Sequence, residues 1–177
     1  MSRANDSCLM AAFSNDCHRV FFECLLEEAR NRLSMDVAYI SEVSGGRLIF
    51  RAVSSRVGET VIQESNSMNL GETYCKYIID NDLPQVINDT AQHDISVSLP
   101  VTQMIPIKSH ISVPIHREDG SIFGMFCCIG QRVNPNLSES DVELMKDYAE
   151  QVASKIQNIS IAALTASRFM PSVVTNL

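Results

Sequence analysis

HISVPIHREDGSIFGMFCCIG, residues 110–130, is the stretch that decides the fold class. Its first arm alternates apolar and polar residues, which is typical of a strand with one buried face. Its second arm, 122–129, is apolar on both faces, so we expect both faces of this strand to be covered. Asp119-Gly120 joins the arms and suits the positive φ angles of a tight hairpin turn. Because proline cannot donate to a ladder, Pro114 should mark a bulge or an unpaired position.

Further strands are predicted on the N-terminal side of this hairpin. Segments 37–43 and 47–53 flank Ser44-Gly45-Gly46, which is a second hairpin signal, and a short strand follows at 85–87. Residues 54–68 are polar and are expected to form a loop. The order of elements has no βαβ rhythm, so we predict an α+β fold. Its centre is an antiparallel sheet of five or six strands, with the terminal helices on one face.

Two helices are predicted before the central hairpin. The first covers 16–33, and its apolar stripe at helical spacing consists of Val20, Phe21, Cys24, Leu25 and Ala29. The second covers 70–80, where Asn69 and Glu72 have the spacing of a capping box. The residues expected to share one face of this second helix are Leu70, Tyr74, Tyr77 and Ile78.

A long last helix is predicted to begin at Ser138. Ser138 and Asp141 form a second capping box, and Leu137 can pack on Val142. The helix carries a heptad seam made of Val142, Met145, Ala149, Val152, Ile156, Ile159 and Ala163. Only Pro171 clearly stops it. Because the seam continues past the normal end of a sheet-covering helix, we expect part of it to be exposed for a helical partner, most simply a second copy.

The segment 88–109 has little periodicity and contains two prolines. A loop of this length in a compact domain is usually a lid, a binding loop or disordered. It lies between the short helix and the central hairpin. We therefore predict that the short helix and this loop cover a pocket on the second face of the sheet.

Composition excludes several classes of function. The net charge is −7, with 14 basic and 21 acidic residues, which argues against a nucleic-acid partner. No apolar run approaches the ~20 residues that span a bilayer, and the first residues are too polar for a secretory signal. We therefore expect a cytoplasmic protein with no membrane partner. The 6 cysteines are then reduced thiols, and the 4 histidines show no spacing for a shared metal site.

Four segments together resemble a GAF domain. They are MDVAYISEVSGGRLIFRAV (35–53), LGETYCKYIIDNDLPQVINDT (70–90), SHISVPIHREDGSIFGMFCC (109–128) and LSESDVELMKDYAEQVASKI (137–156). The second and third are similar to bacterial GAF modules that are often fused to cyclic-di-GMP signalling domains. The resemblance divides the chain into a polar lead-in at 1–15, a GAF domain at 16–160, and a helical extension and tail at 161–177.

The resemblance implies a non-catalytic sensory module that binds a small molecule or dimerises through its terminal helices. A signalling effector domain or protein would be its partner. The ligand and any cofactor stay open. Cys75 is followed by Lys76, whereas GAF domains that hold bilins usually have histidine after the cysteine, which argues against covalent bilin attachment. Two alternatives remain: a GAF-fold free methionine sulfoxide reductase that uses Cys75, Cys127 and Cys128, and a structural dimerisation adaptor without a ligand.

The candidate ligand-binding residues come from the elements expected around the pocket. They are Tyr39, Phe50, Tyr74, Cys75, Asp89, His110 and Ser112. Each has a structural alternative, because the aromatic residues and Cys75 are common core residues and Asp89 can cap a turn. No nucleophile, base and orienting group can be assembled from the spacing of the residues. No catalytic residue and no metal ligand is therefore predicted.

Overall fold

The two predicted hairpins form the middle of an antiparallel sheet in the computed structural model, which describes residues 13, 15–58 and 61–169. The sheet has six strands in the order β3-β2-β1-β6-β5-β4. Their bounds are β1 (Val37–Ser44), β2 (Arg47–Ser55), β3 (Ser67–Asn69), β4 (Val86–Ile87), β5 (Ser109–His116) and β6 (Ile122–Gly130).

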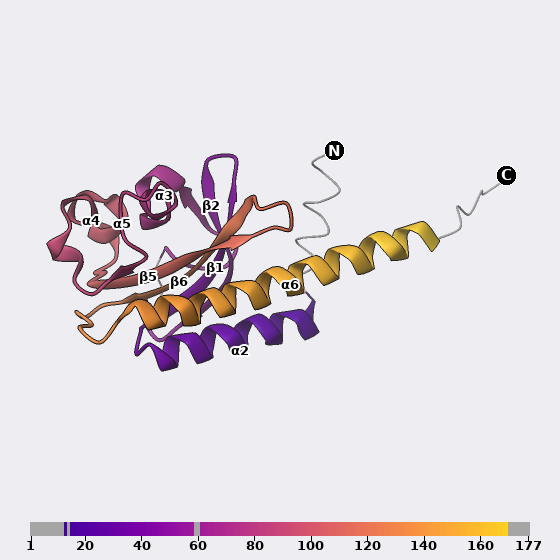
Figure 1. Ribbon diagram of the computed structural model, residues 1–177, viewed down its shortest axis with the longest axis horizontal. Coiled ribbons are helices and arrows are strands. Elements are labelled where there is room, and N and C mark those ends of the chain that lie inside the picture. The colour runs from indigo at the N-terminus through magenta and orange to yellow at the C-terminus, as the bar shows by residue number, and fades with distance from the viewer. Residues whose placement is uncertain (1–12, 14, 59–60, 170–177) are drawn as a thin grey trace.

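Helices cover both faces of this sheet (Figure 1). Their bounds are α2 (Asp16–Arg32), α3 (Tyr74–Ile79), α4 (Asp94–Ser98), α5 (Pro100–Met104) and α6 (Glu139–Phe169), with 3₁₀ turns η1 (Leu70–Glu72) and η2 (Thr90–Gln92). The two long helices, α2 and α6, lie on one face, and α3, α4 and α5 lie on the other (Figure 1). The predicted α+β architecture is therefore confirmed.

The turn residues explain both hairpins. Gly45 and Gly46 have φ angles of +56° and +74°, which a two-residue turn between paired Ser44 and Arg47 requires. In the central hairpin only Gly120 has a positive φ, +79°. That connection is longer than two residues, because the N–H of Arg117 donates to the carbonyl of Ser121 at 2.8 Å.

Pro114 lies at an unpaired edge. The N–H of Ser112 donates to the carbonyl of Gln85 at 2.9 Å, on the β4 side of β5. Backbone donors alternate in direction along a strand, so the nitrogen of Pro114 faces the same side, past the end of β4. The missing donor therefore removes no ladder bond. The register shift in this strand comes immediately afterwards, between Ile115 and His116.

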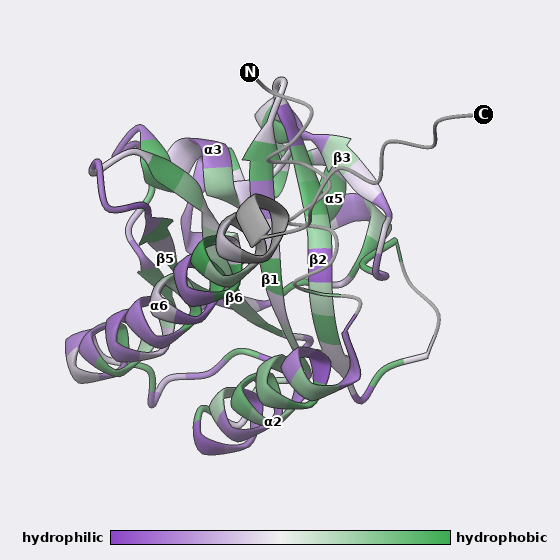
Figure 2. Ribbon diagram, turned by 90° about the vertical axis from the view of Figure 1, so that its right-hand side faces the viewer, coloured by the Kyte–Doolittle hydropathy of each residue, from purple (hydrophilic) through white to green (hydrophobic). Residues whose placement is uncertain are grey.

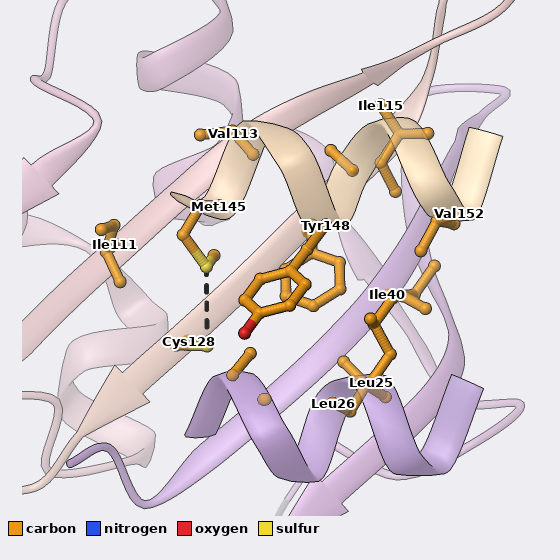
Figure 3. Close-up of a cluster of buried hydrophobic side chains, with 14 of the residues drawn as sticks. Leu25, Leu26, Ile40, Ile111, Val113, Ile115, Cys128, Met145, Tyr148 and Val152 are labelled. Carbon is orange, nitrogen blue, oxygen red and sulfur yellow. Dashed lines mark hydrogen bonds between the residues drawn. The ribbon is translucent and has the colours of Figure 1, made fainter. Parts of the chain in front are cut away.

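A first apolar cluster lies between the sheet and the pair α2 and α6. In Figure 3, Leu25 and Leu26 of α2 and Val152 of α6 lie around Ile40 of β1, and Met145 of α6 points toward Cys128 of β6. Figure 2 shows the hydrophobic sides of both helices turned toward the strands. Cys128 belongs to this cluster and Cys127 to the cluster on the opposite face, as their adjacent positions on a strand require.

The predicted stripe of the first helix is partly wrong. Val20 is 57% exposed and Cys24 is exposed, whereas the residues buried against the sheet are Phe22, Leu25, Leu26 and Ala29. These follow the same helical spacing, rotated by one to two residues. The helix carries more apolar residues than one face can bury. Packing against β1 and β2 buries the face that contains both leucines.

The predicted helix over 70–80 is broken into two pieces. Asn69 caps η1 by accepting from the N–H of Gly71 at 3.0 Å, but Thr73 has extended backbone angles and separates η1 from α3. The preceding polar segment is not only a loop, since it contains β3, which pairs with β2. The long segment 88–109 likewise contains η2, α4 and α5 rather than irregular chain alone.

The last helix begins as predicted and is 31 residues long. The carboxylate of Asp141 accepts from the N–H of Ser138 at 2.8 Å, and Leu137 and Val142 are both buried. The seam is buried against the domain as far as Ile156, and Ile159 is half-buried. The helix then extends beyond the sheet (Figure 1). Pro171 and the lead-in through residue 12 lie outside the described residues. No described helix is both long enough and apolar enough to cross a bilayer.

Candidate functional site

The candidate site lies on the sheet face covered by α3, α4 and α5. Alternation along β5 places His110 and Ser112 on this face, and the cross-strand register places Cys127 of β6 beside Ser112 and Tyr39 of β1 beside Cys127. These four side chains are buried. Strand pairing therefore brings polar groups from three strands into one row, under a layer that is otherwise apolar.

His110 lies at one end of this polar row. Its ring is completely buried and stacks on Tyr74 of α3, with 4.6 Å between centroids and 15° between planes. Burial lowers the pKa of His110 to about 3, so the ring is neutral near pH 7. A neutral imidazole has one donor and one acceptor, and here neither ring nitrogen has a hydrogen-bond partner.

Segment 88–109 supplies further polar groups above the sheet. The hydroxyls of Tyr74 and Thr102 are 2.6 Å apart, and Thr102 donates to the carbonyl of Ser96 at 2.7 Å. The hydroxyls of Ser96 and Ser112, however, are buried without a partner. Unpaired buried polar groups each cost about 1–3 kcal/mol, so folded proteins rarely contain several in one region without a reason.

Two thiols and a phenol lie at the other end of the row. The sulfur atoms of Cys75 and Cys127 are 3.7 Å apart, and the Tyr39 hydroxyl is 4.0 Å from Cys75 Sγ. Hydrogen bonding by the Cys127 thiol is the main cause that lowers the pKa of Cys75. Burial raises the pKa of Cys127 and of Tyr39 well above their ordinary values. Cys75 is therefore the more readily ionised thiol of the pair.

Six of the seven predicted residues come together in this layer. Phe50 joins it through an edge-on contact with Tyr39, with 5.2 Å between ring centroids. Asp89 does not join it, because its carboxylate caps η2 by accepting from the N–H of Ala91 at 3.0 Å. Sequence reasoning missed Ser96 and Thr102, since they lie in a segment without periodicity. The approach of Cys127 to Cys75 joins residues 52 positions apart, and no local pattern signals it.

The layer under α3, α4 and α5 is filled with apolar side chains around these polar groups. Leu99, Val101, Ile105 and Ile107 of the long segment are each no more than 5% exposed. The segment therefore acts as a packed cover rather than as an open lid. Any ligand in this layer would have to displace part of the cover.

An open groove of about 810 Å³ lies on the other side of the molecule, between the tips of both hairpins and α6. Several of its polar groups already have protein partners: Glu42 accepts from Arg51 at 2.8 Å, Arg117 donates to the carbonyl of Ile122 at 2.7 Å, and Gln157 bonds Glu118. None of its described lining side chains is buried without a hydrogen-bond partner. The His110 layer, whose buried polar groups lack hydrogen-bond partners, is the stronger candidate for a ligand site. Within the described ranges, no group of three or more potential metal ligands occurs.

The fold is an α+β domain in which helices cover both faces of one antiparallel sheet, and comparison with known proteins gives the family. The family model described as GAF domain matches residues 19–157, so the chain belongs to the GAF domain family. The expected family resemblance is thus confirmed. Comparison with curated proteins gave no match.

Solved structures confirm the fold. The blue-light absorbing form of the PixJ GAF domain from Thermosynechococcus elongatus has a TM-score of 0.67 at 13% identity, covering 85% of this chain and 90% of that one. The GAF domain of an Acinetobacter phosphoenolpyruvate-protein phosphotransferase has a TM-score of 0.64 at 15% identity, covering 91% of this chain and 97% of that one. A type II free methionine-R-sulfoxide reductase from Thermoplasma acidophilum has a TM-score of 0.60 at 17% identity, covering 80% of this chain and 93% of that one. These proteins have different functions, so the likeness defines the fold alone.

Proposed function

We propose that this chain is a non-catalytic sensory module that binds a small uncharged molecule between the sheet, α3 and the segment 88–109. The observation that carries the proposal is the buried ring of His110, which has two unpartnered nitrogens beside a stacked Tyr74. A ligand with one donor and one acceptor would satisfy that ring. The free hydroxyls of Ser96 and Ser112 provide further hydrogen-bonding points.

The charge of the ligand follows from the lining. His110 is neutral near pH 7, and the serine, threonine and tyrosine hydroxyls of the layer are neutral as well. Burying an unpaired charge costs several kcal/mol or more, so a charged ligand would need a countercharge that these groups do not supply. The proposal therefore favours a neutral, hydrogen-bonding molecule over a nucleotide or another anion.

Segment 88–109 is the part that would open for this ligand. Its helices α4 and α5 have five residues each, which is far too short for stability in isolation. Leu99, Val101 and Ile105 hold them in place by packing into the second apolar cluster, which is the cluster of buried residues on this face of the sheet. Binding would exchange some of those contacts for contacts with the ligand, and the shift of α3 and β5 would carry the signal.

The test is native mass spectrometry of the full chain as purified, together with a visible absorption spectrum and a thermal-shift screen of neutral metabolites. We expect either a carried mass or a stabilising compound, and we expect His110→Phe to lose it. Ligand binding would be contradicted if the wild-type chain carried no extra mass and if no compound stabilised it more than it stabilises His110→Phe. It would then favour the adaptor without a ligand, which the tight packing of this layer supports.

We further propose that the module dimerises through α6 and passes its signal along that helix to an effector domain or protein. The support is the part of α6 beyond the sheet, where Ile159 is half-buried and Ile161 is 53% exposed. The proposal places the protein in the cytoplasm, where the thiols of its five described cysteines, all free, would stay reduced.

A second candidate function is reduction of free methionine sulfoxide, which the 3.7 Å approach of Cys75 and Cys127 favours. One thiolate would attack the sulfoxide sulfur, methionine would leave, and the oxygen would stay on the cysteine as a sulfenic acid. The second thiol would then attack that cysteine sulfur, form the disulfide and release the oxygen as water. Both thiols are fully buried, so a substrate as large as free methionine sulfoxide could reach them only if the cover opened. An assay with free methionine-R-sulfoxide and a dithiol reductant distinguishes the candidates: the sensory proposal expects no activity, and any activity that survives in Cys75→Ser does not use this thiol.

A further inference from the structure

Cys75 and Cys127 are brought together by tertiary structure alone. Cys75 lies at the start of α3, Cys127 lies in the central strand β6, and 3.7 Å separates their sulfur atoms. Both are buried, and both are free thiols. A disulfide requires about 2.05 Å, so the sulfur atoms would have to approach by roughly a further 1.7 Å.

The two cysteines of this pair are held in place differently. Cys127 is fixed by ladders on both sides, to Tyr39 of β1 and to Ser112 of β5. Cys75 lies on a helix of six residues that begins after the extended backbone of Thr73. Small movements of α3 toward the sheet would therefore close the gap without distorting a strand.

Neighbouring groups prepare Cys75 to react first. Its sulfur lies within 4.0 Å of the Tyr39 hydroxyl as well as beside the Cys127 thiol, and both contacts lower the pKa of Cys75. Cys128 cannot replace Cys127, since its side chain lies on the opposite face of the sheet, with its sulfur 4.0 Å from that of Met145. The structure thus singles out one pair among the described cysteines.

We propose that Cys75 and Cys127 form a reversible disulfide when the protein meets a small hydroperoxide. The Cys75 thiolate attacks one peroxide oxygen, the O–O bond breaks, and the second oxygen leaves as water or alcohol after taking a proton. The resulting sulfenic acid is attacked by the Cys127 sulfur, which forms the S–S bond and releases water. Two thiols lose two electrons and two protons in total, and the hydroperoxide is reduced by two electrons.

The bond would join α3 to the centre of the sheet and close a loop of about 50 residues that includes the cover segment 88–109. Since α3 carries Tyr74, oxidation would also hold one wall of the His110 layer in place. That consequence for ligand binding rests on the proposed function. Formation of the bond does not, because disulfide mapping gives the same answer whether or not a ligand exists.

The test uses the full chain as a triple variant, Cys8→Ser, Cys17→Ser and Cys24→Ser. These substitutions remove the exposed thiols of Cys17 and Cys24 and the thiol of Cys8 near the N-terminus. The reduced protein is treated with hydrogen peroxide, free thiols are alkylated, and peptides are mapped by mass spectrometry. We expect a peptide pair joined through Cys75 and Cys127 that dithiothreitol separates. The oxidised chain should melt roughly 5–10 °C higher than the reduced chain.

The matched control is Cys128→Ala, which removes the adjacent buried thiol on the other sheet face and should keep the cross-link. Cys127→Ala should abolish both the cross-link and the rise in Tm. The proposal is overturned if peroxide leaves Cys75 and Cys127 unlinked in the wild-type chain, if Cys75 proceeds to sulfinic acid instead, or if it pairs with another cysteine. Mapping of the wild-type chain keeps the test decisive even where a variant fails to fold.

Discussion

At the scale of single residues, His110 couples the fold to pH. Its pKa is about 3 in the folded chain against 6.5 for an exposed histidine, and burial is the cause. As pH falls from 6.5 toward 3, His110 binds a proton in the unfolded chain but stays neutral in the folded chain. Stability that is fully present above pH 6.5 is therefore lost across that window.

We predict that this single group removes about 2 kcal/mol of unfolding free energy between pH 8 and pH 5. His110→Phe keeps an aromatic ring against Tyr74 and removes both unpartnered nitrogens, so it should be at least as stable at pH 8. Urea unfolding at both pH values measures the effect. An equal loss in the wild type and in His110→Phe would show that other groups cause it.

Among the described glycines, Gly124 is the one at which an added Cβ would come closest to backbone atoms. A Cβ at this position would lie 1.7 Å from the carbonyl oxygen of Ser41 and 2.9 Å from the Cα of Glu42. Both atoms belong to the backbone of β1, which is held by partners on both sides, so neither can yield easily. The glycine is needed for space, since its φ is not positive.

We predict that Gly124→Ala lowers the unfolding free energy by about 2–3 kcal/mol, because strands β1 and β6 must separate or bend. Gly58→Ala is the matched control, as a Cβ there meets nothing within 4 Å, and it should change stability by less than about 0.5 kcal/mol. Chemical denaturation of both variants is sufficient. If the two changes have equal effects, the close approach has no energetic consequence.

At the scale of elements, the start of α6 depends on Asp141. Its carboxylate accepts from both the N–H and the hydroxyl of Ser138, at 2.8 and 3.0 Å. This is half of a capping box, since the Ser138 hydroxyl donates to the carboxylate instead of accepting from the backbone of the helix. One negative charge near the N-terminus also complements the helix dipole.

Asp141→Ala is predicted to destabilise the domain by about 1 kcal/mol, as other lost caps do. Asp147→Asn removes the same charge from an exposed position in the middle of α6, and it should cost less than about 0.5 kcal/mol. Thermal unfolding compares the two. A similar loss in both variants would attribute the effect to net charge and not to the cap.

The elements divide clearly into those that local sequence predicts and those that it does not. The hairpins and the start of α6 follow from Gly45-Gly46 and from Ser138 with Asp141, which act over a few residues. The β3 strand has no such signal, because its polar residues become a strand only by pairing with β2. Helices α4 and α5 likewise form because three apolar side chains, Leu99, Val101 and Ile105, pack into the second apolar cluster.

The candidate site shows the same division. Alternation along β5 was enough to place His110 and Ser112 on one face, and α3 was expected to face them. Whether an acceptor or a thiol stands opposite each residue depends on tertiary contacts. The unpaired state of His110 and the approach of Cys127 to Cys75 therefore emerge only from the folded chain. Whether the predicted residues bind a ligand remains a prediction.

At the scale of the whole molecule, α6 is the element that extends beyond the sheet (Figure 1). Gln157, which follows the buried Ile156, bonds Glu118 at the tip of the central hairpin. Ser112 and His110 lie on the first arm of the same hairpin. A rearrangement around His110 would therefore reach α6 through one rigid ribbon, which is the route that the sensory proposal requires.

The dimer proposal can be tested on the extension of α6. The chain mass is 19.6 kDa, and light scattering after size-exclusion chromatography should give twice this value. Ile159 continues the seam beyond Ile156, so Ile159→Glu should weaken the dimer about 100-fold or more by placing two charges in the interface. Asn158→Glu, at the neighbouring exposed position outside the seam, should leave the mass unchanged.

Ile161 makes the outcome more specific, because it is 53% exposed and lies on the side of α6 opposite the seam. If Ile161→Glu dissociates the dimer and Ile159→Glu does not, the helices pair through that opposite side, and the heptad interpretation is wrong while dimerisation stands. A wild-type chain that stays monomeric at high concentration contradicts both. The seam would then serve only the domain's own core, where Val142, Met145 and Val152 are already fully buried.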